Sequence, residues 1–232
     1  GIDGMKVEDL YSYLQTDREK IKASIRQSLY LPQPILGVEI PKSNGKIRLL
    51  GIPTVSDRWL QQAVGQVLCN HYDMKFEDQS YGFRPNRSAV QAVQTSLGYI
   101  NNGYTCVVDM DLRNFFDEVD HSLLLELLYR RVKCQGTLRL IRKWLRAPIQ
   151  IQGKLLKRRK GVPQGSPLSP ILSNILLDEL DKELARKGVR YIRYADDFSV
   201  YCETESEGVK VQESILKYLN EKLRLPVRTS RT

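Results

Sequence analysis

The sequence lacks the features that build membrane, disulfide-rich and zinc proteins. Its 232 residues contain no apolar run near the roughly 20 residues that a membrane span needs. The first residues form no leader segment and include no initiator methionine, which suggests a piece of a longer protein. Four cysteines are scattered without a C-x-x-C pair, and only two histidines could join them. We therefore expect no disulfide framework, no zinc site, no membrane partner and a cytoplasmic location.

Acidic residues are fewer than basic residues in this chain. The chain has 27 Asp and Glu against 36 Lys and Arg, which gives a formal net charge of +9 and a pI near 9.4. Such an excess suggests a polyanionic partner, and without a membrane span this favours nucleic acid. No G-x-x-x-x-G-K-[ST] pattern occurs, so the chain is not a P-loop enzyme.

Helical and strand patterns are interspersed without a regular βαβ alternation. Residues 38–41 and 47–50 flank an Asn-Gly pair, which is typical of a hairpin. Residues 189–194 and 198–202 are aromatic and β-branched, as in strands, and surround a short turn. Together with leucine-rich helical patterns, these features predict an α+β fold.

Carboxylates interrupt two of these strand patterns. Period-2 geometry puts Asp109 and Asp111 on one face of a strand, while Asp196 and Asp197 stand in the short turn. A solvated strand face and an ordinary Asp-containing turn are the simpler interpretations. However, two carboxylates about 4 Å apart repel by about 4 kcal/mol at an effective dielectric near 20. A divalent ion relieves this repulsion, and oxygen-only ligands suit Mg²⁺.

Phosphoryl transfer is the chemistry that such carboxylates would serve. Two ions can activate an attacking 3′-oxygen and stabilise a leaving pyrophosphate. Lys42, Lys46 and Arg48 on the predicted hairpin could supply cations for a triphosphate. Gln164 comes shortly before a predicted helix N-terminus, where exposed amides favour anions.

Six short sequence blocks, which follow one another along the chain, resemble the conserved blocks of a known enzyme family. The Tyr-Ala-Asp-Asp run resembles the Y-x-D-D signature of reverse transcriptases, and three blocks resemble the bacterial group II intron-encoded branch. The resemblance therefore identifies the fingers and palm portion of a group II intron-encoded reverse transcriptase and maturase. The blocks cover residues 40–53, 57–58, 81–88, 111–117, 161–170 and 194–197.

The resemblance implies a right-hand polymerase. Residues 1–103 would form the fingers, and residues 104–232 a palm built on an antiparallel sheet with packed helices. The thumb and C-terminal regions of the family would come after residue 232. Because the thumb grips the primer–template duplex, we expect weak nucleic-acid binding and weak activity from this chain alone.

The resemblance also implies a metal site. In that pattern Asp111 and Asp196 bind two Mg²⁺ ions and Asp197 assists. The backbone carbonyl of Leu112 completes one coordination sphere, and Mn²⁺ is a substitute ion.

The same pattern implies a nucleotide pocket. Lys42 and Arg48 would clamp the incoming triphosphate, and Gln164 would line the pocket. Phe116 would exclude a ribose 2′-hydroxyl group.

Two basic segments are candidates for contact with nucleic acid. Five cations fall within residues 154–160, where a solvated loop is the simpler interpretation. Residues 81–87 mix aromatic side chains with arginine, a combination suited to stacking on unpaired template bases. The predicted contacts are Arg84, Arg87, Lys157, Arg158, Arg159 and Lys160.

The function that follows is RNA-directed DNA polymerase activity combined with a maturase role. The expected partners are an RNA template, intron RNA, a DNA primer and dNTPs, while homodimer formation stays open. One alternative is an RNA-binding splicing cofactor without catalysis, although the intact Asp111, Asp196 and Asp197 favour catalysis. Another is a reverse transcriptase of a retron, a diversity-generating element or a defence system.

Overall fold

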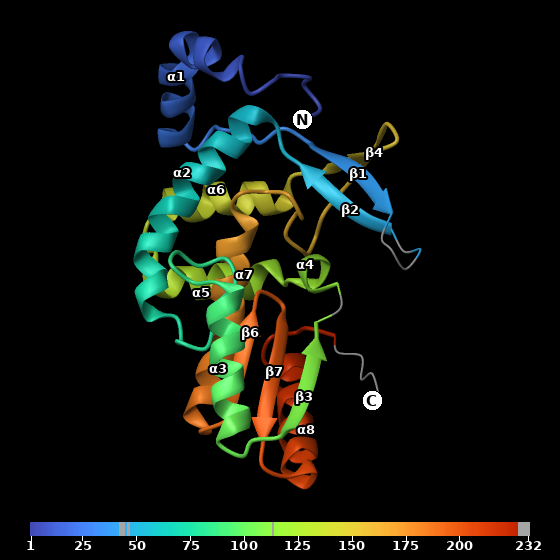
Figure 1. Ribbon diagram of the computed structural model, residues 1–232. Coiled ribbons are helices and arrows are strands. Elements are labelled where there is room, and N and C mark those ends of the chain that lie inside the picture. Colours follow the sequence, from blue (N-terminus) through green and yellow to red (C-terminus); the bar gives the residue numbers. More distant parts are fainter. Residues whose placement is uncertain (42–44, 46, 113, 227–232) are drawn as a thin grey trace. The chain divides into compact units, whose positions relative to one another are not determined.

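The computed structural model describes residues 1–41, 45, 47–112 and 114–226. The chain divides into two compact units, each built from two segments (Figure 1). Unit 1 comprises residues 1–66 and 121–169, and unit 2 comprises residues 67–120 and 170–232. These units group segments that are distant in sequence, and the boundary between fingers and palm at residues 103 and 104 stays a prediction.

Unit 1 contains a four-stranded sheet in the order β2-β1-β4-β5. Strands β1 (Ile35–Pro41) and β2 (Ile47–Ile52) pair antiparallel, which confirms the predicted hairpin. Strand β4 (Ile149–Ile151) adds to β1 in parallel and continues into β5 (Lys154–Leu156). Ile35, Ala147 and Ile149 form a small buried core at this junction.

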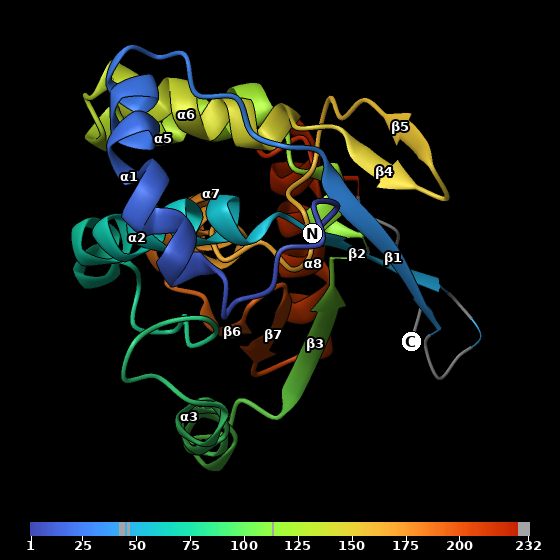
Figure 2. The same ribbon diagram turned by 90° about the horizontal axis from the view of Figure 1, so that it is seen from above.

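A buried carboxylate joins two of the helices of unit 1. The helices of this unit are α1 (Leu10–Arg26), the first part of α2 (Val55–Tyr72), α5 (His121–Arg131) and α6 (Gln135–Arg146) (Figure 2). Asp57 on α2 is buried and accepts hydrogen bonds from the Tyr30 hydroxyl at 2.7 Å and the Trp144 Nε1 at 2.9 Å. The segment after α1 and helix α6 are thereby fastened to α2.

Unit 2 is built on a three-stranded antiparallel sheet in the order β3-β7-β6. The strands are β3 (Cys106–Asp111), β6 (Arg190–Tyr194) and β7 (Asp197–Cys202). Helices α7 (Ser169–Arg186) and α8 (Glu205–Glu221) cover one face, and α3 (Ala89–Asn101) covers part of the other (Figure 1). The predicted α+β class with an antiparallel sheet is confirmed.

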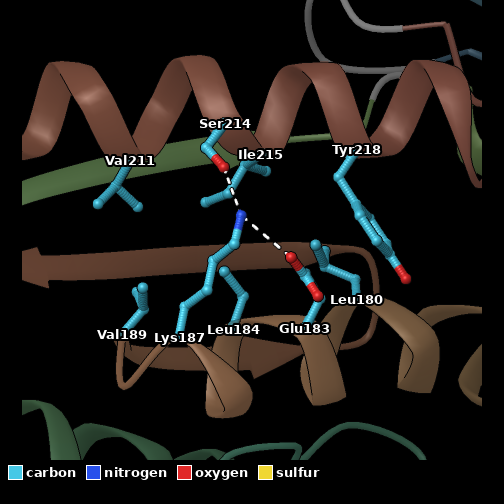
Figure 3. A pocket seen from close by; sticks show the side chains of 9 residues that line it. All are labelled: Leu180, Glu183, Leu184, Lys187, Val189, Val211, Ser214, Ile215 and Tyr218. Atoms are coloured by element: carbon cyan, nitrogen blue, oxygen red, sulfur yellow. Dashed lines mark hydrogen bonds and ion pairs between the residues drawn. The ribbon is translucent and has the colours of Figure 1, made fainter.

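Helices α7 and α8 pack closely against each other. Lys187, just after α7, donates from Nζ to the Ser214 hydroxyl at 2.6 Å and pairs with Glu183 at 3.0 Å (Figure 3). The cavity beside this contact measures about 30 Å³. That volume admits water but no nucleotide, so this cavity does not bind the substrate of a nucleotide-using enzyme. No helix in the described part of the chain is long and apolar enough to cross a membrane.

Candidate active site

Two of the predicted catalytic carboxylates meet at one end of the unit 2 sheet. Asp111 is the last residue of β3, Asp197 is the first of β7, and the two are direct register partners. Such partners project from the same face, with Cβ atoms about 4.5–5.5 Å apart. Both side chains are exposed. The neighbouring residues Met110 and Phe198 are buried on the opposite face, so the strand alternation directs the carboxylates outward.

The electrostatics of this pair suit a divalent cation. Burial, followed by the negative charge of Asp111, raises the pKa of the Asp197 carboxyl above its ordinary value. A bound divalent cation would offset that repulsion, and carboxylate oxygens are the ligands that Mg²⁺ and Mn²⁺ favour. Among the residues described, no three His, Cys, Asp or Glu side chains converge as a metal-holding group. Metal binding by half-buried Asp196 therefore stays a prediction.

The turn between β6 and β7 sets the direction of Asp196. Tyr194 and Asp197 pair across the two strands, which leaves Ala195 and Asp196 as a two-residue loop. Ala195 has φ of +59°, in the left-handed region that L-residues with side chains rarely adopt. Gly82 lies against this turn, because a Cβ added there would be 2.2 Å from the Ala195 nitrogen. This closeness was not predicted, since glycine spacing alone does not reveal which backbone lies opposite.

The segment after β3 carries the predicted steric gate. The Leu112 carbonyl accepts a hydrogen bond from the Phe115 amide at 2.9 Å. A carbonyl oxygen has two lone pairs, so this bond is compatible with the predicted metal contact. Phe115 is buried at the start of α4 (Phe115–Glu118), and its ring meets the half-buried Phe116 ring edge-on at 5.4 Å. Phe115 thus anchors the short helix on which Phe116 stands.

Two of the predicted nucleotide-binding residues, Arg48 and Gln164, lie in unit 1. Arg48 is exposed on β2, and Gln164 is half-buried. The Gly51 amide on β2 donates to the Gln164 carbonyl at 2.7 Å, so the Pro-Gln-Gly block is attached to the strand that carries Arg48. Lys42 lies outside the described residues.

A basic cleft also lies in unit 1. It has a volume of about 740 Å³, and Lys157 and Arg159 on its wall are exposed. Arg158 is half-buried and donates from Nη2 to the Gly161 carbonyl at 2.8 Å. Arg146, at the end of α6, was not predicted; the one available signal was its place one hairpin before the basic run. The lining residues are Arg146, Pro148, Leu155, Lys157, Arg158 and Arg159.

Arg84 does not fit the predicted contact with nucleic acid. Its side chain is 5% exposed and donates to Asp73 Oδ1 at 2.8 Å and to the carbonyls of Glu77 and Ser80 at 2.8 and 2.9 Å. The guanidinium is therefore used to shape its own loop. Phe83, in the same loop, is 49% exposed and free to meet a base.

Arg87 is better placed for such a contact. Its side chain is 27% exposed, pairs with the exposed Asp78 and lies over the Tyr81 ring. An exposed ion pair is weak and exchanges readily, so this arginine can change partner.

These features fit one class of enzyme. The chain belongs to the reverse transcriptase (RNA-dependent DNA polymerase) family, whose pattern matches residues 40–231. Membership brings a general dependence on divalent metal ions.

The chain is also similar to individual members of known families and to solved structures. Protein YkfC of Escherichia coli K12 is 32% identical over 270 positions, which cover 100% of this chain and 71% of YkfC. The group II intron-encoded protein LtrA of Lactococcus lactis subsp. cremoris is 34% identical, covering 90% of this chain and 37% of LtrA. A telomerase structure from Candida albicans matches with a TM-score of 0.68 at 16% identity, covering 85% of this chain and 42% of that one. This last likeness shows the fold alone.

Proposed function

We propose that this chain carries the nucleotidyl-transfer site of an RNA-directed DNA polymerase from a group II intron-encoded protein. The observation that carries the proposal is the register pairing of Asp111 with Asp197 beside the Tyr-Ala-Asp-Asp turn. The chain's similarity to LtrA supports the intron-encoded branch and, with it, binding of intron RNA in a maturase role.

The carboxylates would hold the metal ions. Asp111 and Asp196 are the proposed ligands, assisted by Asp197 and by the Leu112 carbonyl. When bound, two Mg²⁺ or Mn²⁺ ions would activate the primer 3′-hydroxyl and neutralise charge that develops on the triphosphate. The chain's own contribution is to hold these oxygens at the edge of a rigid sheet, with the apolar face of the strands packed against helices.

The remaining predicted site residues would recognise the incoming nucleotide. Arg48, together with Lys42, would bind the triphosphate of an incoming dNTP, and Gln164 would contact its base or sugar. Arg48 is an exposed cation on a paired strand, which suits a phosphate contact that forms only when the nucleotide arrives.

Replacing Phe116 with alanine is expected to admit ribonucleotides. Because the buried Phe115 anchors α4, removing the neighbouring ring should open space without moving the helix. We expect discrimination against rNTPs to fall about tenfold or more, since one or more apolar groups are lost from the pocket wall. Primer extension with single rNTPs and dNTPs measures this ratio. Unchanged discrimination in a folded variant would remove Phe116 from the nucleotide pocket.

The basic cleft is proposed to bind RNA phosphates. In the double variant Lys157→Gln, Arg159→Gln, we expect weaker RNA binding and a salt dependence less steep by about 1.4, at about 0.7 per lost contact on a single strand. Anisotropy of a labelled RNA at several salt concentrations measures this slope. The exposed Lys210 and Lys217 on α8 provide a control, because replacing both with glutamine changes the net charge equally. If both double variants reduce RNA binding and its salt dependence equally, the loss reflects net charge alone and the cleft is not a specific RNA-binding site.

Primer extension tests the function itself. The chain is mixed with an RNA template, an annealed DNA primer, Mg²⁺ and dNTPs, and product lengths are measured. Extension that requires both the RNA template and Mg²⁺ is the expected result. Tight RNA binding without any extension would instead favour the splicing cofactor that acts without catalysis.

A further inference from the structure

The turn that carries Asp196 rests on a buried guanidinium group. Arg193 lies on β6, two residues before Ala195, and its side chain is completely buried. Asp181 on α7 is buried to the same extent and accepts from Arg193 Nε at 2.9 Å. Each charge would be costly to bury without the other, so the pair is a fixed element of unit 2.

Every N–H group of this guanidinium has an acceptor. Arginine has five such donors. Nε and Nη2 donate to Asp181, and Nη2 also donates to the Ser80 hydroxyl at 2.7 Å. Nη1 donates to Asn174 Oδ1 at 3.0 Å and to the Ala195 carbonyl at 2.8 Å. One side chain therefore connects α7, the loop before α3 and the turn itself.

The Ala195 carbonyl is the point where this network reaches the active site. The left-handed conformation of Ala195 is unfavourable for an L-residue with a side chain. Such a conformation persists only where the surroundings hold it. The hydrogen bond from Arg193 Nη1 fixes the peptide plane that joins Ala195 to Asp196. The direction of the Asp196 side chain follows from that plane.

We propose that Arg193, held by Asp181, is a positioning residue for nucleotidyl transfer: it fixes the turn from which Asp196 and Asp197 project, and so sets how these carboxylates hold divalent cations. This inference rests on the proposed function. Neither Arg193 nor Asp181 belongs to the predicted metal-binding carboxylates. The proposal assigns to this pair the positioning of the turn, in addition to any contribution to stability.

The variant Arg193→Lys tests the role. Lysine keeps a positive charge beside Asp181, but a compact ammonium group lacks the planar fork that also reaches the Ala195 carbonyl. We expect the Mg²⁺ concentration for half-maximal extension to rise, and the saturating rate to fall by about 100-fold, as for a displacement near 1 Å. Mn²⁺ titrations of the chain, followed by electron paramagnetic resonance, should show weaker binding without any turnover.

A matched control and a rescue separate positioning from stability. Tyr191, also buried on β6, donates from its hydroxyl to the Asp181 backbone carbonyl at 3.2 Å, on the side of α7 rather than of the turn. Tyr191→Phe loses one buried hydrogen bond, so it should lower the unfolding temperature and leave Mn²⁺ binding unchanged. Glycine adopts positive φ without strain. Adding Ala195→Gly to Arg193→Lys should therefore restore part of the Mn²⁺ affinity.

The outcomes are distinct. Wild-type Mn²⁺ binding and Mg²⁺ dependence in a folded Arg193→Lys variant would overturn the positioning role. Mn²⁺ binding by the wild-type chain no tighter than by Asp196→Asn would count against the proposed metal site instead. If Arg193→Lys does not fold, the pair Arg193→Gln, Asp181→Asn removes both charges together and replaces it in the same assays.

Discussion

Replacing Asp196 with asparagine is expected to lower the rate of primer extension by about 1000-fold or more while the chain stays folded. Asparagine keeps the shape of the side chain and removes its negative charge, so it is a poor ligand for Mg²⁺. Metal-ion stabilisation of the transition state contributes several kcal/mol, and each 1.36 kcal/mol is a factor of ten in rate. Single-turnover extension measures the rate, and thermal unfolding checks the fold.

Stability should not fall in this variant. Asp196 is half-buried and directly precedes Asp197, the register partner of Asp111. Asparagine has nearly the same size and shape as aspartate, so the unfolding temperature should change little in the absence of metal. A combined loss of rate and of folded structure would show that Asp196 acts through the fold.

Asp109 provides the matched control. It lies on β3 two residues before Asp111 and on the same face, and it accepts a hydrogen bond from its register partner Ser199. Asp109→Asn changes the net charge of the strand by the same amount. We expect the rate to change by no more than about twofold, the range of an ordinary surface substitution. A loss as large as in Asp196→Asn would mean that total negative charge, rather than particular ligands, supports the reaction.

The local features of this fold were predictable because they depend on neighbouring residues. An Asn-Gly pair between two apolar runs predicts the β1–β2 hairpin, and it forms with β1 and β2 in antiparallel register. Strand alternation predicts that Asp109 and Asp111 share one face, away from buried Met110. These predictions need only the geometry of a strand and the turn that follows it.

The contacts that complete the site were not predictable because they join distant segments. Arg84 and Arg193 are both arginines whose guanidinium groups are buried and hydrogen-bonded within the protein. The residues next to them in sequence do not indicate this burial. The carboxylate that pairs with each lies on another element: Asp73 follows α2, and Asp181 stands on α7. The parallel pairing of β1 with β4 is hidden for the same reason, since the two strands are separated by more than a hundred residues.

Gly82→Ala is expected to lower the extension rate by about 100-fold with a smaller effect on stability. An added methyl group would lie 2.2 Å from the Ala195 nitrogen and 2.9 Å from the Tyr194 carbonyl carbon. Both are backbone atoms and cannot rotate away, so either the loop or the catalytic turn must move. Overpacking of this kind costs about 1–3 kcal/mol, whereas a displacement near 1 Å at a reacting centre costs about 100-fold in rate.

The Gly82 loop is itself held in place, and this decides which side moves. Asn174 Nδ2 donates to the Gly82 carbonyl at 3.0 Å, while Arg84 fixes the Ser80 carbonyl at 2.9 Å. These two hydrogen bonds hold the Gly82 loop on both sides of the glycine, so we expect the turn to shift and the rate to fall. Gly98→Ala on α3 is the control, because no atom lies within 4 Å of its added Cβ and alanine stabilises a helix interior by about 0.5–1 kcal/mol. A normal extension rate in Gly82→Ala, together with reduced stability, would contradict this prediction. It would show that the Gly82 loop moves and that the turn with Ala195 and Asp196 keeps its position.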